Sequence, residues 1–310
     1  MRVSCFVLLC FLILPICSNA QSSKEINTNE VALSTSDRTY VSFGQGLGRY
    51  KTPYGMRPLK SLVFEGQISP GFYLSLSKQK TIGFAFFPKI IVRMYNEPSL
   101  PVKTPSYMPS VLFYHSIKSS ILPKIIFRGS EAEKQLTFVT YRLTHHSNGQ
   151  NASYFIKNTD SINYTNGNFS TNSAEIGLSW STTDSSITGK FFINGRISYE
   201  RQLEIAREDD LKDNYYYNKI SIENRFIYSE RVKMYVIYSF MSGTKHFGTR
   251  HSIDAYCAFK IFHKRSDFSI FIRGYAGPDY YNLYYENKLR TLSIGIIADP
   301  LSIPVFKKKR

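Results

Sequence analysis

Two side chains that could act as a nucleophile and its base, His145 and Ser147, stand two residues apart in the sequence. They end a segment, residues 136–147, whose polarity alternates every second residue, as is typical of a β-strand. A strand places both side chains on one mainly apolar face and turns His146 to the other face. A serine hydroxyl becomes nucleophilic when a base lies within hydrogen-bond reach, so this spacing is compatible with acyl transfer.

The base in turn needs an acceptor that orients it, and the next alternating segment, residues 168–180, offers one. If the two segments pair as a hairpin, Asn172 lies on the same face as His145 and Ser147. Its amide oxygen can then accept a hydrogen bond from the imidazole, which predicts a Ser-His-Asn variant of the catalytic triad. Asn168 is a rival on the same face, and we prefer Asn172 because it lies deeper in the strand. The ordinary alternative is that polar residues at a strand end simply face water.

The elements that must position these residues are β-strands, because apolar alternating segments are separated by clusters of Gly, Asn, Asp, Ser or Pro throughout the chain. About twelve strands are expected, over residues 40–49, 59–76, 81–95, 110–121, 136–147, 168–180, 189–202, 216–229, 233–242, 251–263, 268–276 and 289–298.

Aromatic clusters and uneven connections favour a single transmembrane antiparallel β-barrel, an all-β fold, over a soluble β protein. Tyrosines gather at expected strand ends, over residues 215–217 and 280–285, as in the girdles of membrane barrels. A long polar connection, residues 150–167, contrasts with the short turn expected at residues 181–184. Alternation alone also fits a large soluble β protein, which remains the alternative fold.

The N-terminus has the pattern of an export signal. Residues 1–20 combine a positive start, an apolar core and a small-x-small site, so cleavage is expected after Ala20. A polar lead-in over residues 21–37 is expected to be unstructured and to precede a barrel over residues 38–310. After Ala20 no apolar stretch approaches the length of about 18 residues that a spanning helix needs.

The sequence carries a formal net charge of +16. Because the Lys and Arg residues are spread along the chain and the protein is predicted to be exported, no nucleic-acid partner is expected. Anionic lipid headgroups suit such a surface better.

Two sequence patches resemble the outer-membrane phospholipase A family. Residues 145–149, His-His-Ser-Asn-Gly, resemble its H-x-S-N-G signature, and residues 101–109, Pro-Val-Lys-Thr-Pro-Ser-Tyr-Met-Pro, resemble its P-F-R-E-T-N-Y-E-P segment. The surroundings of Asn172 depart from the family pattern, because the Trp, Arg and Tyr of its W-N-R-x-Y context are missing.

The resemblance implies a 12-stranded barrel that works as a calcium-dependent homodimer, with its site on the lipid-facing surface. Ser147 would be the nucleophile, His145 the base and Asn172 the orienting residue, with the N–H of Gly149 in the oxyanion hole. Calcium would be held by the residues that match the family's ligand positions, Gln150 and Asn168 or Ser170. The family's ligand from the partner subunit corresponds to Leu100 here, and the adjacent Ser99 would take its place.

The leading hypothesis is therefore an outer-membrane phospholipase, a carboxylic ester hydrolase of the A1/A2 type, with phospholipid as substrate and Ca²⁺ as cofactor. The alternative is a non-catalytic outer-membrane barrel, either a pore or a structural or adhesin protein. A third hypothesis is a secreted, soluble lipid-binding β protein.

Overall fold

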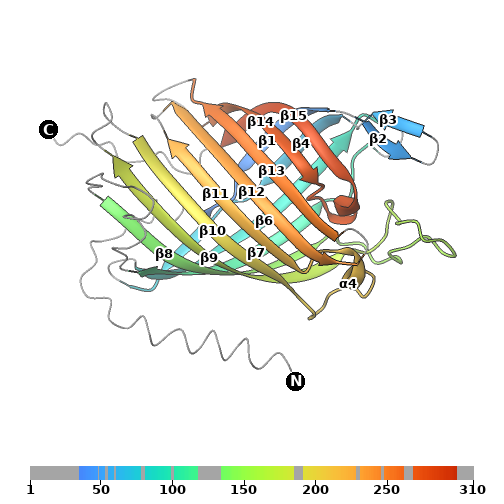
Figure 1. Cartoon of the computed structure of the whole chain (residues 1–310), viewed down its shortest axis with the longest axis horizontal. Helices are drawn as coiled ribbons and strands as arrows, with labels where there is room; N and C mark the ends of the chain where they lie inside the picture. The colour runs from blue at the N-terminus through green and yellow to red at the C-terminus, as the bar shows by residue number, and fades with distance from the viewer. Residues whose placement is uncertain are drawn as a thin grey trace.

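The computed structural model describes a barrel of strongly inclined strands (Figure 1). The residues that it describes are 35–47, 49–52, 55–58, 61–77, 81–98, 101–117, 134–184, 191–227, 231–245, 248–261 and 268–298. The predicted signal sequence, most of the predicted lead-in and Ser99 lie outside these residues.

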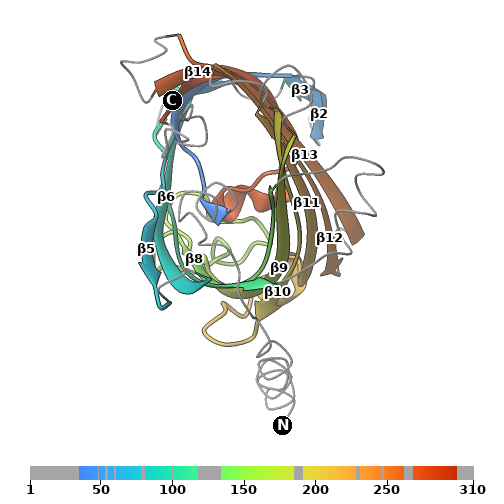
Figure 2. The same ribbon diagram turned by 90° about the vertical axis from the view of Figure 1, so that its left-hand side faces the viewer.

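One antiparallel sheet closes on itself to form the wall, as the view along the barrel shows (Figure 2). Its strands are β1 (Thr39–Gly46), β4 (Leu62–Ile68), β5 (Phe72–Ser75), β6 (Ile82–Tyr95), β7 (Ser106–Ile117), β8 (Lys134–Ser147), β9 (Ser170–Asp184), β10 (Phe191–Leu203), β11 (Asn218–Ile227), β12 (Val232–Thr244), β13 (Gly248–Phe259), β14 (Phe268–Pro278) and β15 (Lys288–Ala298). Pairing of β4 with β6 completes the ring.

The wall has twelve positions, as predicted, because β4 and β5 are two segments of one strand position that both pair with β6. Each of the twelve predicted segments corresponds to one position. Several boundaries differ from the prediction by up to four residues, as at β7, which begins at Ser106 and not at residue 110. The predicted short turn at residues 181–184 is the last part of β9, and β9 begins at Ser170, two residues after the expected start.

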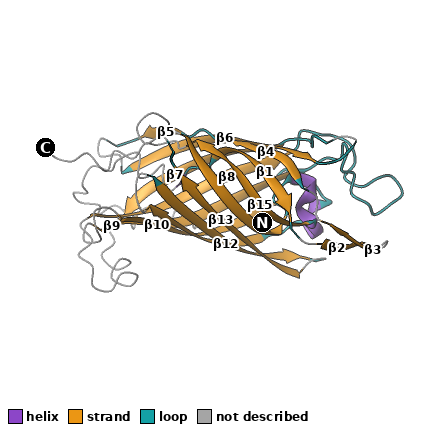
Figure 3. Cartoon of the chain, turned by 90° about the horizontal axis from the view of Figure 1, so that it is seen from above, coloured by secondary structure: helices purple, strands orange, loops and turns teal. Residues whose placement is uncertain are grey.

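A small hairpin, β2 (Arg49–Thr52) with β3 (Gly55–Pro58), stands apart from the wall and was not predicted as a separate sheet. The short helices α4 (Leu211–Asn214) and η2 (Asn282–Glu286) lie at one end of the barrel (Figure 3). In the part of the chain that the structure describes, no helix is long and apolar enough to cross a membrane.

The wall is apolar outside, and its inner face combines polar and charged side chains with buried apolar clusters such as that of Phe87, Leu112 and Phe138. Along β15, Leu292, Ile294 and Ile296 are more than half exposed, whereas Thr291 and Ser293 between them are buried. Successive side chains of a strand point to opposite faces, so a polarity that alternates every second residue gives the strand two different faces. An outward apolar face is the arrangement expected of a barrel that contacts lipid.

Ion pairs inside the barrel balance the charges that face the lumen. Arg93 lies 2.8 Å from Asp279 and also pairs with Glu65, and Arg273 bridges Glu65 and Asp254. A buried charge costs several kcal/mol unless it is paired, so these pairs allow a polar interior.

The segment of residues 35–38, which precedes β1, lies inside the lumen. Arg142 donates a hydrogen bond to the carbonyl oxygen of Thr35 at 2.5 Å, and Asp37 pairs with Lys89. Arg38 pairs with Asp254. Residues 35–37, which were predicted to be unstructured, are thus held by the barrel wall.

Candidate active site

The two residues predicted to form the base and its orienting partner are hydrogen-bonded. Nδ1 of His145 lies 2.9 Å from Oδ1 of Asn172. The strands β8 and β9 pair in the predicted hairpin, and their register sets these two residues directly opposite each other. Cross-strand partners lie about 5 Å apart, which suits a bond between a ring and a short amide.

The other end of the Asn172 amide is held by a loop that follows β10. Its Nδ2 donates to the carbonyl oxygen of Ile205 at 2.8 Å and lies 3.4 Å from that of Ala206. Because both of these acceptors are carbonyls, the amide nitrogen must face the loop, and its oxygen therefore faces His145. An imidazole that bonds to this oxygen carries its proton on Nδ1, so Nε2 is left as the basic atom.

Ser147 is the last residue of β8 and lies between the two neighbouring strands. Its backbone partners are Tyr107 in β7 and Ser170 in β9, and its side chain is half-buried. Among the described residues, no hydrogen bond joins its hydroxyl to His145. Both side chains nonetheless share one face two residues apart, and catalytic hydrogen bonds are often longer before substrate binds.

A tight turn follows Ser147 and is fixed by Asn148, which is buried. The Asn148 side chain donates to the carbonyl oxygen of Gly167 at 2.8 Å and accepts from the N–H groups of Gln150 and Phe169. Gly149 has φ of +69°, a left-handed conformation that glycine adopts without steric cost. The Asn and Gly of the H-x-S-N-G motif therefore have local structural roles. Asn148 fixes the turn through its side-chain hydrogen bonds, and Gly149 adopts the positive φ that the turn requires.

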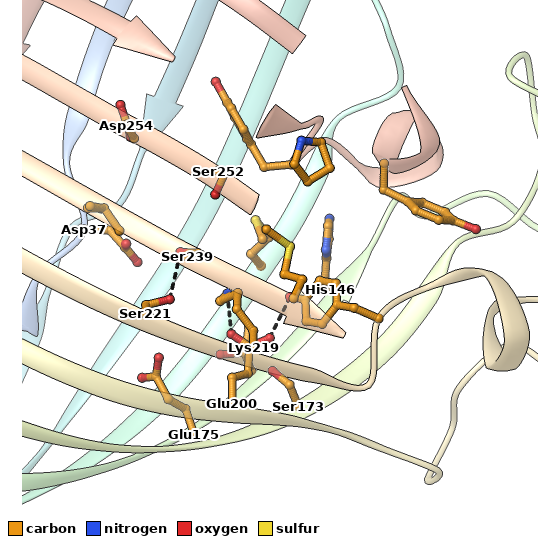
Figure 4. Close-up of a pocket in the computed structure, with 18 of the residues that line it drawn as sticks. Asp37, His146, Ser173, Glu175, Glu200, Lys219, Ser221, Ser239, Ser252 and Asp254 are labelled. Carbon is orange, nitrogen blue, oxygen red and sulfur yellow. Dashed lines mark hydrogen bonds and ion pairs between the residues drawn. The ribbon is translucent and has the colours of Figure 1, made fainter. Parts of the chain in front are cut away.

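His146 belongs to the interior, as the period of two predicted. It is buried, its Nε2 lies 3.3 Å from Oγ of Ser106, and its ring packs edge-on against Phe169. Figure 4 shows His146 in the luminal cavity with Glu200 and Lys219. It is therefore separated by the wall from His145, which is exposed on the outside.

The outer surface around His145 and Ser147 is apolar. Leu143, two residues from His145, is 61% exposed, and Val111 and Ile176 on the adjoining strands are also exposed. An acyl chain lying against this wall would contact apolar side chains next to the polar side chains of His145 and Ser147.

Only some of the predicted calcium ligands lie close to Ser147. Ser170 is opposite Ser147 in the sheet, and its hydroxyl lies 3.4 Å from the carbonyl oxygen of Ala206. Asn168 lies before β9 and donates through its amide nitrogen to Glu208 at 2.5 Å, so it turns away from His145.

Oxygen atoms come together beside these residues, because the Ser170 hydroxyl lies 3.4 Å from the Ala206 carbonyl oxygen and the Glu208 carboxylate accepts a hydrogen bond from Asn168. Hydroxyls, carbonyls and a carboxylate are the donors that calcium accepts, so the donor set fits this ion. Within the described ranges, no group of three or more His, Cys, Asp or Glu could hold a metal.

Sequence reasoning missed two contributors to the site, Asn148 and the loop carbonyls of Ile205 and Ala206. Asn148 stood inside the quoted motif, and its position between Ser147 and a glycine could have identified a turn-forming side chain. Carbonyl groups give no such signal, because every residue has one.

Comparisons with known proteins give a structural likeness only. No family model matches the sequence, and no curated protein matches it. The structure resembles outer-membrane phospholipase A from Escherichia coli, with 11% identity and a TM-score of 0.57 over 90% of this chain and 100% of that one.

It also resembles the Salmonella typhi outer-membrane phospholipase, solved as a dimer with bound calcium, with 10% identity and a TM-score of 0.56 over 86% and 92% of the two chains. At these identities the likeness concerns the fold, which is a closed 12-stranded antiparallel β-barrel similar to that of outer-membrane phospholipase A.

Proposed function

We propose that this protein is an outer-membrane phospholipase that hydrolyses acyl esters of phospholipids. The observation that carries the proposal is the hydrogen bond from His145 to Asn172 on the outer, apolar face of the barrel, with Ser147 on the same face two residues away. A base oriented in this way beside a hydroxyl is the arrangement that nucleophilic acyl transfer requires.

In the first step, Oγ of Ser147 attacks the ester carbonyl carbon while Nε2 of His145 takes its proton. Asn172 accepts the hydrogen bond from Nδ1 and keeps the ring in place as it becomes positively charged. The N–H of Gly149 faces the developing oxyanion, where a donor is worth about 2.7–4 kcal/mol of the activation barrier. The lysophospholipid leaves with the proton from His145.

In the second step, His145 removes a proton from water, which attacks the acyl-serine. The bond to Oγ of Ser147 breaks, the fatty acid leaves, and His145 returns its proton to Oγ. The apolar wall excludes bulk water, so charge interactions at the oxyanion are stronger than in solution.

In this proposal calcium is the cofactor and would bind beside the site. Gln150 and Ser170 would hold it, with Asn168 as a further oxygen ligand and Ser99 contributed by a second subunit of a homodimer. Bound there, the ion would supply positive charge near the oxyanion and would polarise a water molecule. The calcium-bound dimer among the structural neighbours supports the same combination of ion and assembly.

The exposed apolar wall and the predicted signal over residues 1–20 support a membrane location. In this proposal the chain is cleaved after Ala20, and the barrel, residues 38–310, sits in the outer membrane with its substrate in the surrounding leaflet.

A passive pore is less well supported. The luminal cavity measures about 300 Å³, and residues 35–38 cross the interior with ion pairs to the wall. Buried ion pairs such as Arg196 with Glu175, at 2.6 Å, occupy the lumen further along.

The test is ester hydrolysis by the refolded protein in detergent, with calcium or with a chelator, for the wild type and Ser147→Ala. Ser153→Ala is the matched control because Ser153 is exposed in the loop after the motif. We expect Ser147→Ala to lose at least about 10³-fold in kcat and Ser153→Ala to remain active. Hydrolysis that persists in Ser147→Ala would reject the proposal, and calcium-independent hydrolysis would remove only the cofactor.

A further inference from the structure

One cation, Arg201, stands on the outer face beside the candidate triad. Arg201 in β10 is paired with Ala174 in β9, and Asn172 is two residues from Ala174 along that strand. Diagonal neighbours of this kind are about 7–8 Å apart. Arg201 is exposed, unlike the Glu200 and Gln202 side chains on either side, which turn toward the lumen.

The side chain of Arg201 is held in place by its neighbours. Its Nη1 donates to Oδ1 of Asn218 at 2.7 Å, and the same oxygen accepts from the hydroxyl of Tyr199 at 2.8 Å. The guanidinium carbon lies 5.2 Å from the centre of the Tyr217 ring. These contacts use one of the five guanidinium donors, and no carboxylate pairs with Arg201 in the described part of the chain.

The apolar side chains around Arg201 make its exposed position on the outer wall energetically unfavourable. This argues against a purely structural role for Arg201. Ile176 and Ile197, on β9 and β10, are exposed on the same wall, as is Leu143. Arg196 and Arg273, in contrast, point inward onto carboxylates, whereas Arg290 on β15 is exposed as Arg201 is. An arginine facing lipid costs up to about 2–4 kcal/mol at the bilayer centre and little near the interface, and ionisable residues in such positions are frequently functional.

We propose that Arg201 binds the phosphate of the phospholipid whose ester is attacked by Ser147, an inference that rests on the proposed function. A guanidinium presents paired N–H donors that match phosphate oxygens in two-point geometry. In a glycerophospholipid only the glycerol unit separates the phosphate from the acyl esters. A phosphate held at Arg201 therefore keeps the acyl esters on the outer face that carries His145 and Ser147, and Arg201 selects phospholipids over uncharged esters.

The experiment compares two substrates with identical acyl chains in mixed detergent micelles, phosphatidylethanolamine and diacylglycerol. The variants are Arg201→Gln, Arg201→Lys and the control Arg290→Gln, whose arginine is exposed on β15, away from the site. We expect Arg201→Gln to lower kcat/KM for phosphatidylethanolamine about tenfold, mainly through KM, and to leave diacylglycerol hydrolysis unchanged. Arg201→Lys should restore part of the loss, because it keeps the charge without the two-point geometry.

Equal losses on both substrates, no loss on either, or the same loss in Arg290→Gln would each overturn the proposal. Inorganic phosphate added to the assay separates a lipid phosphate from a free anion. A site for a free anion predicts that phosphate changes diacylglycerol hydrolysis in the wild type but not in Arg201→Gln, and that result would also overturn it. Failure of the proposed function looks different, because Ser147→Ala would then hydrolyse both substrates as well as the wild type.

Discussion

The carbonyl oxygen of Ile205 accepts a hydrogen bond of 2.8 Å from the amide nitrogen of Asn172. The opposite end of the same amide binds His145 at 2.9 Å. A loop after β10 therefore sets the orientation of a side chain on β9, which in turn orients a ring on β8. The candidate site thus depends on three consecutive strands and one loop.

Replacing Asn172 by alanine should lower kcat about 100-fold with little change in KM, because the imidazole loses the acceptor that orients it. The matched variant is Asn166→Ala, since Asn166 is exposed in the loop before β9 and has no role in the proposed site. Steady-state kinetics on a phospholipid in micelles measures both. Equal losses in kcat for the two variants would contradict the assignment of Asn172.

Gly149→Ala should reduce activity at a modest cost in stability. Its φ of +69° costs an alanine about 1–2 kcal/mol, while the nearest atom to an added Cβ, in the Tyr107 ring, lies at 3.4 Å. Gly248→Ala is the control, because its φ is +59° and nothing lies within 4 Å of an added Cβ. Unfolding in denaturant should give similar destabilisation for both variants, and kinetics should show a loss only for Gly149→Ala. Full activity of Gly149→Ala would exclude a role for that turn in catalysis.

Calcium binding should weaken about tenfold in Ser170→Ala, because one oxygen ligand next to Ser147 is removed. Calorimetric titration of calcium into the detergent-solubilised protein measures this without relying on activity. Ser161→Ala, in an exposed part of the loop before β9, provides the comparison. Unchanged affinity in Ser170→Ala would show that the hydroxyl is not a ligand.

The wild-type protein should carry little steady current in a planar bilayer, and the double variant Asp37→Ala with Arg38→Ala should carry more. Arg38 pairs with Asp254 and lies over the ring of Tyr256 at 4.7 Å, so its loss frees the segment inside the lumen. Lys212→Ala, which removes an exposed ion pair at the end of the barrel, is the control. A wild-type conductance equal to that of the double variant would mean that residues 35–38 do not obstruct the lumen.

An arginine on the outer wall should destabilise the protein in lipid. Ile294 is 55% exposed on β15, and Ile294→Arg should cost about 2–4 kcal/mol if this position lies at the bilayer centre. Ile156→Arg is the control, because Ile156 is 50% exposed in the loop between β8 and β9. Urea unfolding from lipid vesicles measures both changes. Equal stability of the two variants would argue against burial of Ile294 in lipid.

The strand pattern was predictable because a wall with a polar and an apolar side imposes a period of two on every strand. The same rule correctly placed His145 and His146 on opposite sides of β8. It could not reveal the β2–β3 hairpin, which adds no alternation of its own. It could not find residues 35–38 in the lumen either, since short polar segments have the same composition whether they are held or free.

The residues of the candidate site were predictable to different degrees. Pairing of β8 with β9 predicts that His145 and Asn172 share a face, but their direct opposition depends on the register, which the long connection between the strands does not set. Asn168 and Asn172 could not be separated by face alone, and the difference comes from Glu208, which binds Asn168 from a distant loop. Contacts with backbone carbonyls and with remote loops cannot be inferred from the residue types in the sequence.

Alternation along β8 has a consequence for how this sequence can change over evolutionary time. Neighbouring positions have different surroundings: Thr144 and His146 line the luminal cavity, whereas His145 and Ser147 belong to the proposed site on the outer face. A substitution at one of these positions therefore hardly changes which residues are tolerated at the next position. Stability and reactivity can therefore drift independently within a single strand, which would let the interior diverge widely while a few outward residues stay constant.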